Sequence, residues 1–213
     1  MIHVVDYGTS NIRSVFNAFE RLLCPVQLTS DPAKVGSAAG LVLPGVGSFG
    51  RSAQVLAETG LMDAVREAVK NGVPLLGICL GMQLLFAESE EGPATLPGMG
   101  LFPGRLRRFP PERKVPHMGW NTVEFDEPQG LFAGIRPGSH FYFVHSYYLP
   151  LSDCPPGSAQ TTYGRTFASA VQVGRIMGTQ FHPEKSGNVG LRVLSNFAHE
   201  ICKIPRSIDK EDI

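Results

Sequence analysis

The sequence predicts an α/β fold with a mainly parallel sheet that antiparallel strands extend. In the first half, short apolar runs alternate with segments of helical periodicity, which is typical of strand–helix–strand units. Residues 99–176 are instead rich in Gly, Pro and aromatic residues with alternating polarity, which indicates antiparallel strands and loops. With 213 residues, 43% of them hydrophobic, we expect a single domain over 1–213 whose polar tail starts at about residue 204.

The first half divides into seven predicted elements. Asn11 can cap a helix whose apolar positions recur between residues 12 and 23. The run 73–78 is almost continuously apolar, as expected for a strand that is buried on both faces. The predicted strands are 2–6, 25–30, 40–44 and 73–78, and the predicted helices are 12–23, 52–71 and 80–87.

The second half predicts three strands and a closing helix. The strands are expected at 141–148, 167–173 and 175–181. Residues 189–201 carry apolar side chains on one helical face, which predicts a helix that packs on the sheet.

Charge and cysteine content exclude several classes of protein. Nineteen basic and nineteen acidic residues give a net charge of zero, which argues against a nucleic-acid-binding stripe or an acidic tail. No apolar run reaches the roughly 20 residues of a membrane span, and residues 1–6 read as a strand rather than a signal peptide. The four cysteines form no CxxC pair, so we expect no metal, no cofactor and no disulfide framework, and a cytoplasmic location.

Cys79 is the candidate nucleophile. It lies in Gly77-Ile78-Cys79-Leu80-Gly81, between a predicted buried strand and the next helix. A sharp strand-to-helix turn lifts a nucleophile out of the sheet, and the start of the helix favours a thiolate. The Leu80 N–H would lie where it could hold an oxyanion. The alternative is a buried cysteine between two glycines that serve only packing.

His182 and Glu184 are the candidate base and its orienting carboxylate. In extended chain, residues i and i+2 face the same way, and Pro183 keeps His182 out of the helical region. A cysteine nucleophile needs an imidazole within reach, and that imidazole needs a carboxylate to fix its tautomer. The alternative is an unrelated surface pair at the end of a strand.

These motifs resemble the class I glutamine amidotransferase family. Residues 77–83 (GICLGMQ) are similar to its nucleophile motif, 181–184 (FHPE) to its base motif and 44–47 (PGVG) to its oxyanion strand. Their order along the chain also fits, and the resemblance covers nearly the whole chain. It implies a doubly wound α/β fold and an enzyme that releases ammonia from glutamine.

Further segments resemble one branch of this family, the glutaminase subunits of imidazole glycerol phosphate synthase. They are 6–11 (DYGTSN), 44–49 (PGVGSF), 116–121 (PHMGWN), 143–147 (FVHSY) and 181–186 (FHPEKS). Ser10 and Gly187 depart from the branch, which usually has Gly and Gln at these places. The branch implies a (β/α)8-barrel cyclase partner in a heterodimer, ammonia transfer to it, and a place in histidine biosynthesis.

The resemblance also implies roles for residues around the nucleophile. The backbone near Val46 would join the Leu80 N–H as an oxyanion donor once its peptide is correctly turned. Five residues would bind glutamine: Gly47, Gln83, His145, Ser146 and Tyr147. Gln83 could instead be a helix-surface residue, and 145–147 could be ordinary strand residues.

A third set of residues is expected at the interface with the partner. Trp120 is the only tryptophan, and tryptophan is enriched in protein interfaces. His117, Asn11 and Lys185 lie in the same branch-specific segments. The alternatives are a core position for Trp120 and a solvated side chain for Lys185.

Three other functions compete with this interpretation. Another amidotransferase subunit, such as the anthranilate, carbamoyl phosphate, aminodeoxychorismate or pyridoxal phosphate type, would share the triad but not segments 6–11 and 116–121. A stand-alone hydrolase of γ-glutamyl bonds would be fully active without a partner. A binding module with a relic site would not form a thioester at Cys79.

Overall fold

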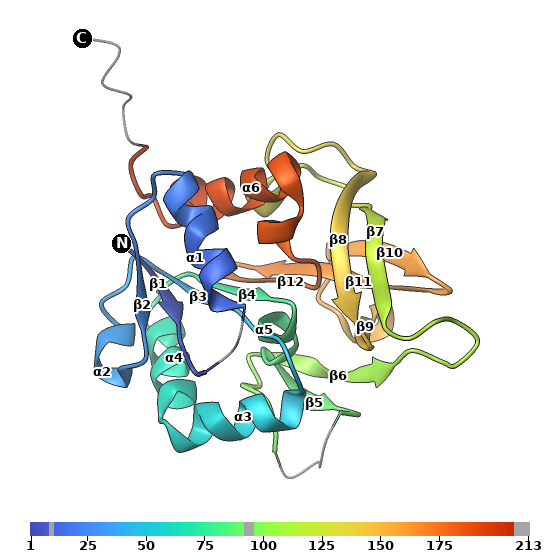
Figure 1. The fold of residues 1–213 in the computed structure, drawn as a ribbon, viewed down its shortest axis with the longest axis horizontal. Coiled ribbons are helices and arrows are strands. Elements are labelled where there is room, and N and C mark those ends of the chain that lie inside the picture. The colour runs from blue at the N-terminus through green and yellow to red at the C-terminus, as the bar shows by residue number, and fades with distance from the viewer. Residues whose placement is uncertain (9–10, 92–95, 207–213) are drawn as a thin grey trace.

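The computed structural model describes residues 1–8, 11–91 and 96–206, which form a mixed sheet with helices on both faces (Figure 1). The α/β fold predicted from the sequence is confirmed. Ser10, where the sequence departs from its branch, lies outside the described residues, as do residues 207–213 of the predicted polar tail. Within the described part, no helix is both long and apolar enough to cross a membrane.

The large sheet contains ten strands among the described residues, in the order β2-β1-β3-β4-β12-β11-β9-β6-β5, with β10 paired to β11. The first five are parallel: β2 (Val26–Thr29), β1 (Ile2–Val5), β3 (Gly40–Leu43), β4 (Leu75–Ile78) and β12 (Ile176–Thr179). Antiparallel pairing enters with β11 (Arg165–Val173), β9 (Tyr147–Pro150), β6 (Phe102–Arg108) and β10 (Ala159–Tyr163). The edge strand β5 (Phe86–Ser89) pairs with β6 in parallel.

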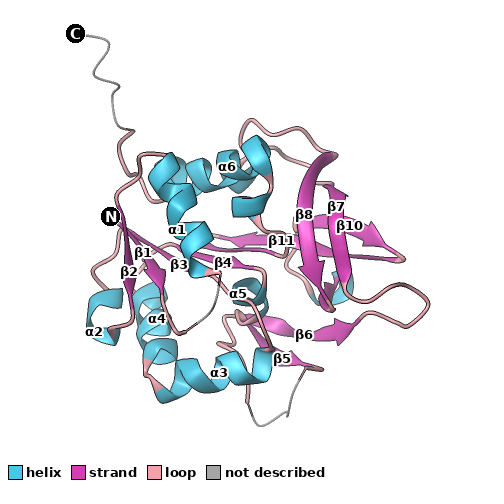
Figure 2. Cartoon of the chain, in the orientation of Figure 1, coloured by secondary structure: helices cyan, strands magenta, loops and turns pink. Residues whose placement is uncertain are grey.

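Helices cover both faces of the parallel strands (Figure 2). One face holds α1 (Ile12–Arg21) and α6 (Gly187–Ser195), which continues as a π-helical turn at Asn196–Ile201. The other face holds α3 (Phe49–Glu58) and α4 (Leu61–Lys70). The chain also forms α2 (Pro32–Val35), α5 (Leu80–Gln83) and short 3-10 turns at Gly130–Phe132, Leu151–Asp153 and Pro183–Lys185. Strands β1, β3 and β4 are buried along their whole length, because each is covered on both sides.

Two of the predicted helices are wrong in extent. The segment 52–71 is two helices, because Gly60 takes a left-handed conformation (φ 73°) between α3 and α4. The predicted helix 80–87 ends at Gln83, since Phe86 pairs with Phe102 as part of β5. Strand pairing with a distant segment overrides the local helical pattern.

A second, two-stranded sheet stands beside the large one (Figure 1). Its strands are β7 (His117–Val123) and β8 (Ser139–His145), which pair in antiparallel register from His117↔His145 to Val123↔Ser139. The predicted strand 141–148 therefore belongs to two sheets, because it breaks at Ser146 and resumes as β9.

Helix α5 packs so closely on strand β3 that only glycine fits between them. A Cβ on Gly81 would lie 1.7 Å from the carbonyl oxygen of Leu43, and one on Gly45 would lie 2.8 Å from Cβ of Leu80. A Cβ on Gly77 would lie 2.6 Å from the carbonyl oxygen of Gly81, so both glycines that flank Cys79 are needed for close packing. This contact fixes the position of the Cys79 turn against the sheet.

A pair of buried histidines joins β7 to β8. Nδ1 of His145 donates to the carbonyl oxygen of Tyr147 at 2.8 Å, which leaves its Nε2 to accept from Nδ1 of His117 at 3.0 Å. Asn121 Nδ2 lies 3.3 Å from the remaining nitrogen of His117. Burial lowers the pKa of His117 to about 4 and that of His145 to about 3, so both rings are neutral.

We expect Gly81→Ala to lower the free energy of unfolding by about 3 kcal/mol or more, because the added methyl group overlaps the Leu43 carbonyl and forces α5 away from β3. Urea unfolding of the variant measures the loss. Gly36→Ala is the matched control, since Gly36 has right-handed helical angles and open space around its Cβ position. Equal stabilities of the two variants would contradict this packing argument.

We expect stability to fall as the pH drops from 7 to 5, partly because of the histidine pair. Both rings have pKa values below 6.5 in the folded chain, so the unfolded chain takes up protons first as the pH falls. His117→Gln removes one titrating ring and should reduce the loss of unfolding free energy over this range by about 1–2 kcal/mol. Urea unfolding at both pH values checks it.

The control for this experiment is His140→Gln, because His140 is exposed. Its unfolding free energy should show the same pH dependence as the parent chain. If the stability of His117→Gln depends on pH as that of the parent does, the pKa of this ring does not differ between the folded and unfolded chain.

Candidate active site

Cys79 occupies a strained turn between β4 and α5. Its φ is 55° and its ψ is −109°, and residues with a side chain rarely adopt a positive φ. Its N–H donates to the carbonyl oxygen of Thr179 at 2.7 Å, and its own carbonyl accepts from the N–H of Gln83 at 3.1 Å. The hydrogen bonds on both sides hold the strained residue in place, which is typical of functional turns.

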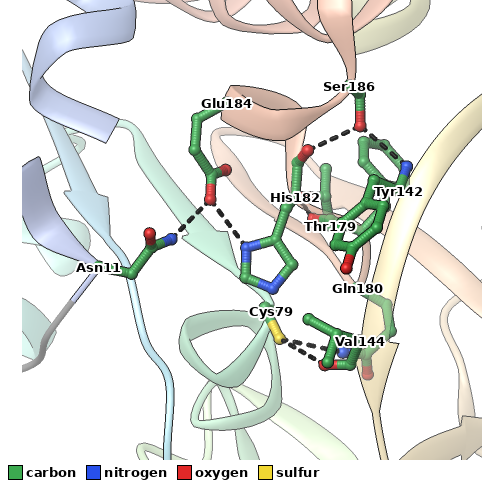
Figure 3. Close-up of polar contacts among 10 residues, drawn as sticks. Asn11, Cys79, Tyr142, Val144, Thr179, Gln180, His182, Glu184 and Ser186 are labelled. Atoms are coloured by element: carbon green, nitrogen blue, oxygen red, sulfur yellow. Dashed lines mark hydrogen bonds and ion pairs between the residues drawn. The ribbon is translucent and has the colours of Figure 1, made fainter. Parts of the chain in front are cut away.

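His182 and Glu184 form a buried pair directly after β12. Nδ1 of His182 donates to Oε1 of Glu184 at 2.8 Å, and the two side chains are 1% and 0% exposed. Figure 3 shows the other ring nitrogen, Nε2, turned toward the Cys79 sulfur. Among the described residues, Nε2 has no hydrogen-bond partner. The ring is therefore fixed by the carboxylate and presents a free nitrogen beside the thiol.

The local backbone differs from the extended chain that we expected for this pair. His182 itself is extended, but residues Pro183–Lys185 form a 3-10 turn. Glu184 therefore reaches His182 because the chain curls back after the proline, and the predicted alternation of an extended strand is wrong here. The predicted meeting of the two side chains does not depend on it.

Opposite electrostatic effects act on His182. Burial lowers the pKa of its ring, but the charge of the Cys79 thiolate and the Glu184 carboxylate raise the pKa by more, so the net pKa lies above its ordinary value. The protonated ring is therefore favoured beside a thiolate. Cys79 and His182 can exchange a proton within an ion pair, as a cysteine nucleophile requires.

Asn11 contributes to the triad and not only to the surface. Its Nδ2 donates to Oε1 of Glu184 at 2.7 Å, and this oxygen also accepts from His182. Two donors therefore hold one carboxylate oxygen (Figure 3). Asn11 was predicted to be an interface residue and a helix cap, but its side chain makes no cap hydrogen bond to α1.

A cavity of about 260 Å³ opens beside the Cys79 sulfur. Its lining contains all eight residues other than His182 and Glu184 for which the sequence predicted a catalytic, oxyanion or glutamine-binding role: Val46, Gly47, Cys79, Leu80, Gln83, His145, Ser146 and Tyr147. Pro116, Val144 and Glu91 complete the wall. Segments that are far apart in sequence therefore converge on one chamber.

Hydrogen bonds hold two side chains of this wall in place. Gln83 is buried and donates through Nε2 to the carbonyl oxygen of Tyr147 at 3.2 Å and to Oε1 of Gln180 at 2.9 Å. His145 is buried with both ring nitrogens in hydrogen bonds. The helix-surface alternative for Gln83 is therefore wrong. Gly47 has a φ of 105°, a backbone conformation that any residue with a side chain would adopt only with strain.

Glu91 and Gln180 lie at the site, but the sequence did not predict a role for either. Glu91 lines the cavity and accepts from the N–H of Phe49 at the start of α3 at 2.8 Å, and burial raises the pKa of its carboxyl group. It lies in an acidic run that resembles a solvated loop. Gln180 contacts the Cys79 sulfur, with Nε2 3.7 Å away. Its position two residues before His182 was the available signal.

The predicted interface residues fall into two groups. Trp120 and Met118 of β7 are 56% and 61% exposed, so the core alternative for Trp120 is wrong, and Lys185 is also exposed. His117 is only 3% exposed, and its ring is stacked on Tyr163 and bonded to His145. The prediction that His117 lies on a contact surface is therefore wrong: alternation along β7 turns it inward while Trp120 points outward.

The described residues contain no group of three or more His, Cys, Asp or Glu side chains placed to hold a metal ion. All four cysteines are free.

Comparison with known proteins identifies the family. The model of the class-I glutamine amidotransferases matches residues 3–201. The imidazole glycerol phosphate synthase subunit HisH of Moorella thermoacetica is 50% identical over 196 residues, which are 92% of this chain and 93% of that protein. The same subunit of Geobacillus kaustophilus is 50% identical over 203 residues, with coverage of 92% and 95%.

Solved structures agree at the level of the fold. A crystal structure of glutamine amidotransferase superposes with a TM-score of 0.74 at 22% identity and covers 96% of this chain and 100% of that one. A chain of the PurLQS structure from Thermotoga maritima gives 0.74 at 18% identity, with 93% and 97% covered. The elbow cysteine, the buried His–Glu pair and these matches lead to one conclusion. The chain belongs to the class-I glutamine amidotransferase family, and within it to the HisH subunits of imidazole glycerol phosphate synthase.

Proposed function

We propose that this chain hydrolyses glutamine to glutamate and ammonia with a triad of Cys79, His182 and Glu184. The observation that carries the proposal is the buried Glu184–His182 pair, whose free Nε2 faces a cysteine at a strained elbow above the cavity. Acyl transfer needs a nucleophile, a base and a carboxylate that orients the base, and these three groups already lie together.

The reaction proceeds in two halves. The Cys79 thiolate attacks the side-chain amide carbon of glutamine, and the protonated His182 gives its proton to the departing nitrogen, which leaves as ammonia. A γ-glutamyl thioester remains on the sulfur. Neutral His182 then takes a proton from a water molecule, which attacks the thioester and releases glutamate and the thiolate. Glu184, held by Asn11, keeps Nδ1 protonated throughout.

Backbone donors at the cavity wall would hold the oxyanion. The N–H of Leu80 follows the nucleophile directly, and Val46 and Gly47 line the same cavity. Loss of one such donor typically slows a reaction roughly 10²–10³-fold. The enzyme would therefore be switched on if the peptide near Val46 turned only in the presence of the partner and acceptor substrate. Gly47 makes that turn easy.

The remaining wall residues would bind the substrate's head group. Gly47, Ser146 and Tyr147 offer backbone and hydroxyl groups. Nε2 of Gln83 is already bonded, so its Oε1 is the atom that would accept from the substrate. His145 is neutral and fully bonded, so it acts by shaping the wall. Glu91 supplies a carboxylate that suits the ammonium group of an amino-acid substrate.

We further propose that the chain works as the glutaminase subunit of an imidazole glycerol phosphate synthase heterodimer in histidine biosynthesis. Its partner would be a (β/α)8-barrel cyclase, which receives the ammonia. The exposed face of β7 with Met118 and Trp120, together with Lys185, supports docking there. The free cysteines fit a cytoplasmic location, and residues 1–213 would act as one glutamine amidotransferase domain.

Cys79→Ser should lower the glutaminase kcat roughly 10³-fold or more, because a serine hydroxyl beside this histidine is a far weaker nucleophile. The assay measures glutamate release by the chain together with the cyclase subunit. In the parent chain, acid-quenched samples should carry a γ-glutamyl thioester on the Cys79 peptide in mass spectra.

Cys154→Ser is the matched control, since Cys154 is only partly buried and donates to Leu151 away from the cavity. It should retain the parental kcat. Turnover by Cys79→Ser within tenfold of the parent would exclude Cys79 as the nucleophile, and a parent chain that never forms the thioester would favour a binding module.

Trp120→Ala should weaken association with the cyclase by about tenfold or more, because an exposed aromatic residue is a typical interface anchor. Glutamine turnover should be low for the isolated chain and should rise as cyclase is titrated in, and the variant should need a higher cyclase concentration for the same rise. Val173→Ala, at an exposed apolar residue of β11, should leave the titration unchanged.

Unchanged affinity of Trp120→Ala would remove Trp120 from the interface. Full turnover by the isolated chain would instead favour a stand-alone hydrolase and refute activation by the partner.

A further inference from the structure

Gln180 is a fully buried amide that contacts the nucleophile. It follows β12 and is 0% exposed, and its Nε2 lies 3.7 Å from the Cys79 sulfur, within the range of an N–H···S hydrogen bond (Figure 3). A buried amide is retained only where its polar atoms are paired. The sulfur is the hydrogen-bond partner of its N–H group.

The orientation of this amide is fixed by a second one. Nε2 of Gln83 donates to Oε1 of Gln180 at 2.9 Å and to the carbonyl oxygen of Tyr147 at 3.2 Å. Because the Tyr147 carbonyl can only accept, the nitrogen of Gln83 must face it and Gln180. The oxygen of Gln180 then faces Gln83, and its NH2 group faces Cys79. Reversal of the Gln180 amide would place two NH2 groups against each other.

The sulfur therefore has different partners in its two protonation states. A thiol S–H can donate to the carbonyl oxygen of Val144, which lies 3.8 Å from the sulfur. A thiolate can only accept a hydrogen bond, and the side-chain amide of Gln180 can donate one to it. Hydrogen bonds to the charged form favour that form, and they do so most strongly where water is absent.

We propose that Gln180 is a catalytic residue that donates a hydrogen bond to the Cys79 thiolate, and that Gln83 is a positioning residue that holds the Gln180 amide for this task. The proposal rests on the proposed role of Cys79 as nucleophile. Gln83 then has two roles, since it lines the cavity and also orients the group that contacts the nucleophile. His182 and Gln180 then stabilise the same charge, one by a proton and one by a dipole.

The test is the pH profile of alkylation of Cys79 in the full-length chain. Iodoacetamide reacts with the thiolate, and mass spectrometry of the Cys79 peptide separates this site from Cys24, Cys154 and Cys202. Gln180→Met keeps a similar volume without the donor. The midpoint of its profile should move up by about one pH unit or more, since a hydrogen bond to a charged group is worth at least that much.

Two further variants sharpen the result. Gln180→Glu keeps the shape and the acceptor for Gln83 but places a carboxylate against the sulfur, so its midpoint should rise further. Gln83→Met leaves Gln180 in place without its anchor, so its midpoint should rise by less. Gln172→Met, at an exposed glutamine of β11, should match the parent chain.

His182, Tyr7 and Glu91 also lie around Cys79 or its cavity, and they are unchanged in all four variants. Midpoints of Gln180→Met and Gln180→Glu equal to the parent's would overturn the proposal and leave Gln180 a packing residue. If Gln180→Met does not fold, Gln180→Glu and Gln83→Met carry the same comparison. Failure of the proposed function has a separate signature, because it would appear as absent glutamine turnover whatever the alkylation midpoint.

Discussion

The contact between α5 and β3 is the constraint on which the site depends. Gly81 lies so close to the Leu43 carbonyl that this contact sets the distance between the start of α5 and the sheet. Cys79, one residue before α5, must then take a positive φ to join β4 to the helix. The strain of one residue is offset by the packing of the whole turn, which therefore presents the sulfur, the Leu80 N–H and the Gln83 side chain together.

The parallel pairing of β4 and β12 explains why the triad meets. Ile78 is opposite Thr179 in the register, so the residues that follow both strands emerge at the same edge of the sheet. Cys79 comes from one strand, and Gln180 and His182 come from the other, although about a hundred residues separate them in the chain. The short turn at Pro183–Lys185 then returns Glu184 to the far side of the imidazole.

Local structure could be predicted from the sequence where the residues that determine it are contiguous. The continuous apolar run of β4 and the glycines around Cys79 each predict their own structure, and the His–Pro–Glu segment predicts the contact between its two side chains but not the 3-10 turn that makes it. Contacts between distant segments were not readable. The amide of Gln180, the hydrogen bond from Asn11 to Glu184 and the inward side of β7 at His117 all depend on which strands and loops become neighbours. The early end of α5 has the same cause, since β5 exists only because β6 pairs with it.

Val144 connects the outer surface to the reacting sulfur. Its carbonyl oxygen contacts Cys79, it lines the cavity, and across the small sheet it is paired with the exposed Met118. Only Met118 and Val144 thus separate a molecule bound at the exposed face of β7 from the thiol. By thermodynamic linkage, any ligand that binds β7 and β8 more tightly when Val144 is displaced must also change the free energy of acylating Cys79, and acylation must change the ligand's affinity by the same factor.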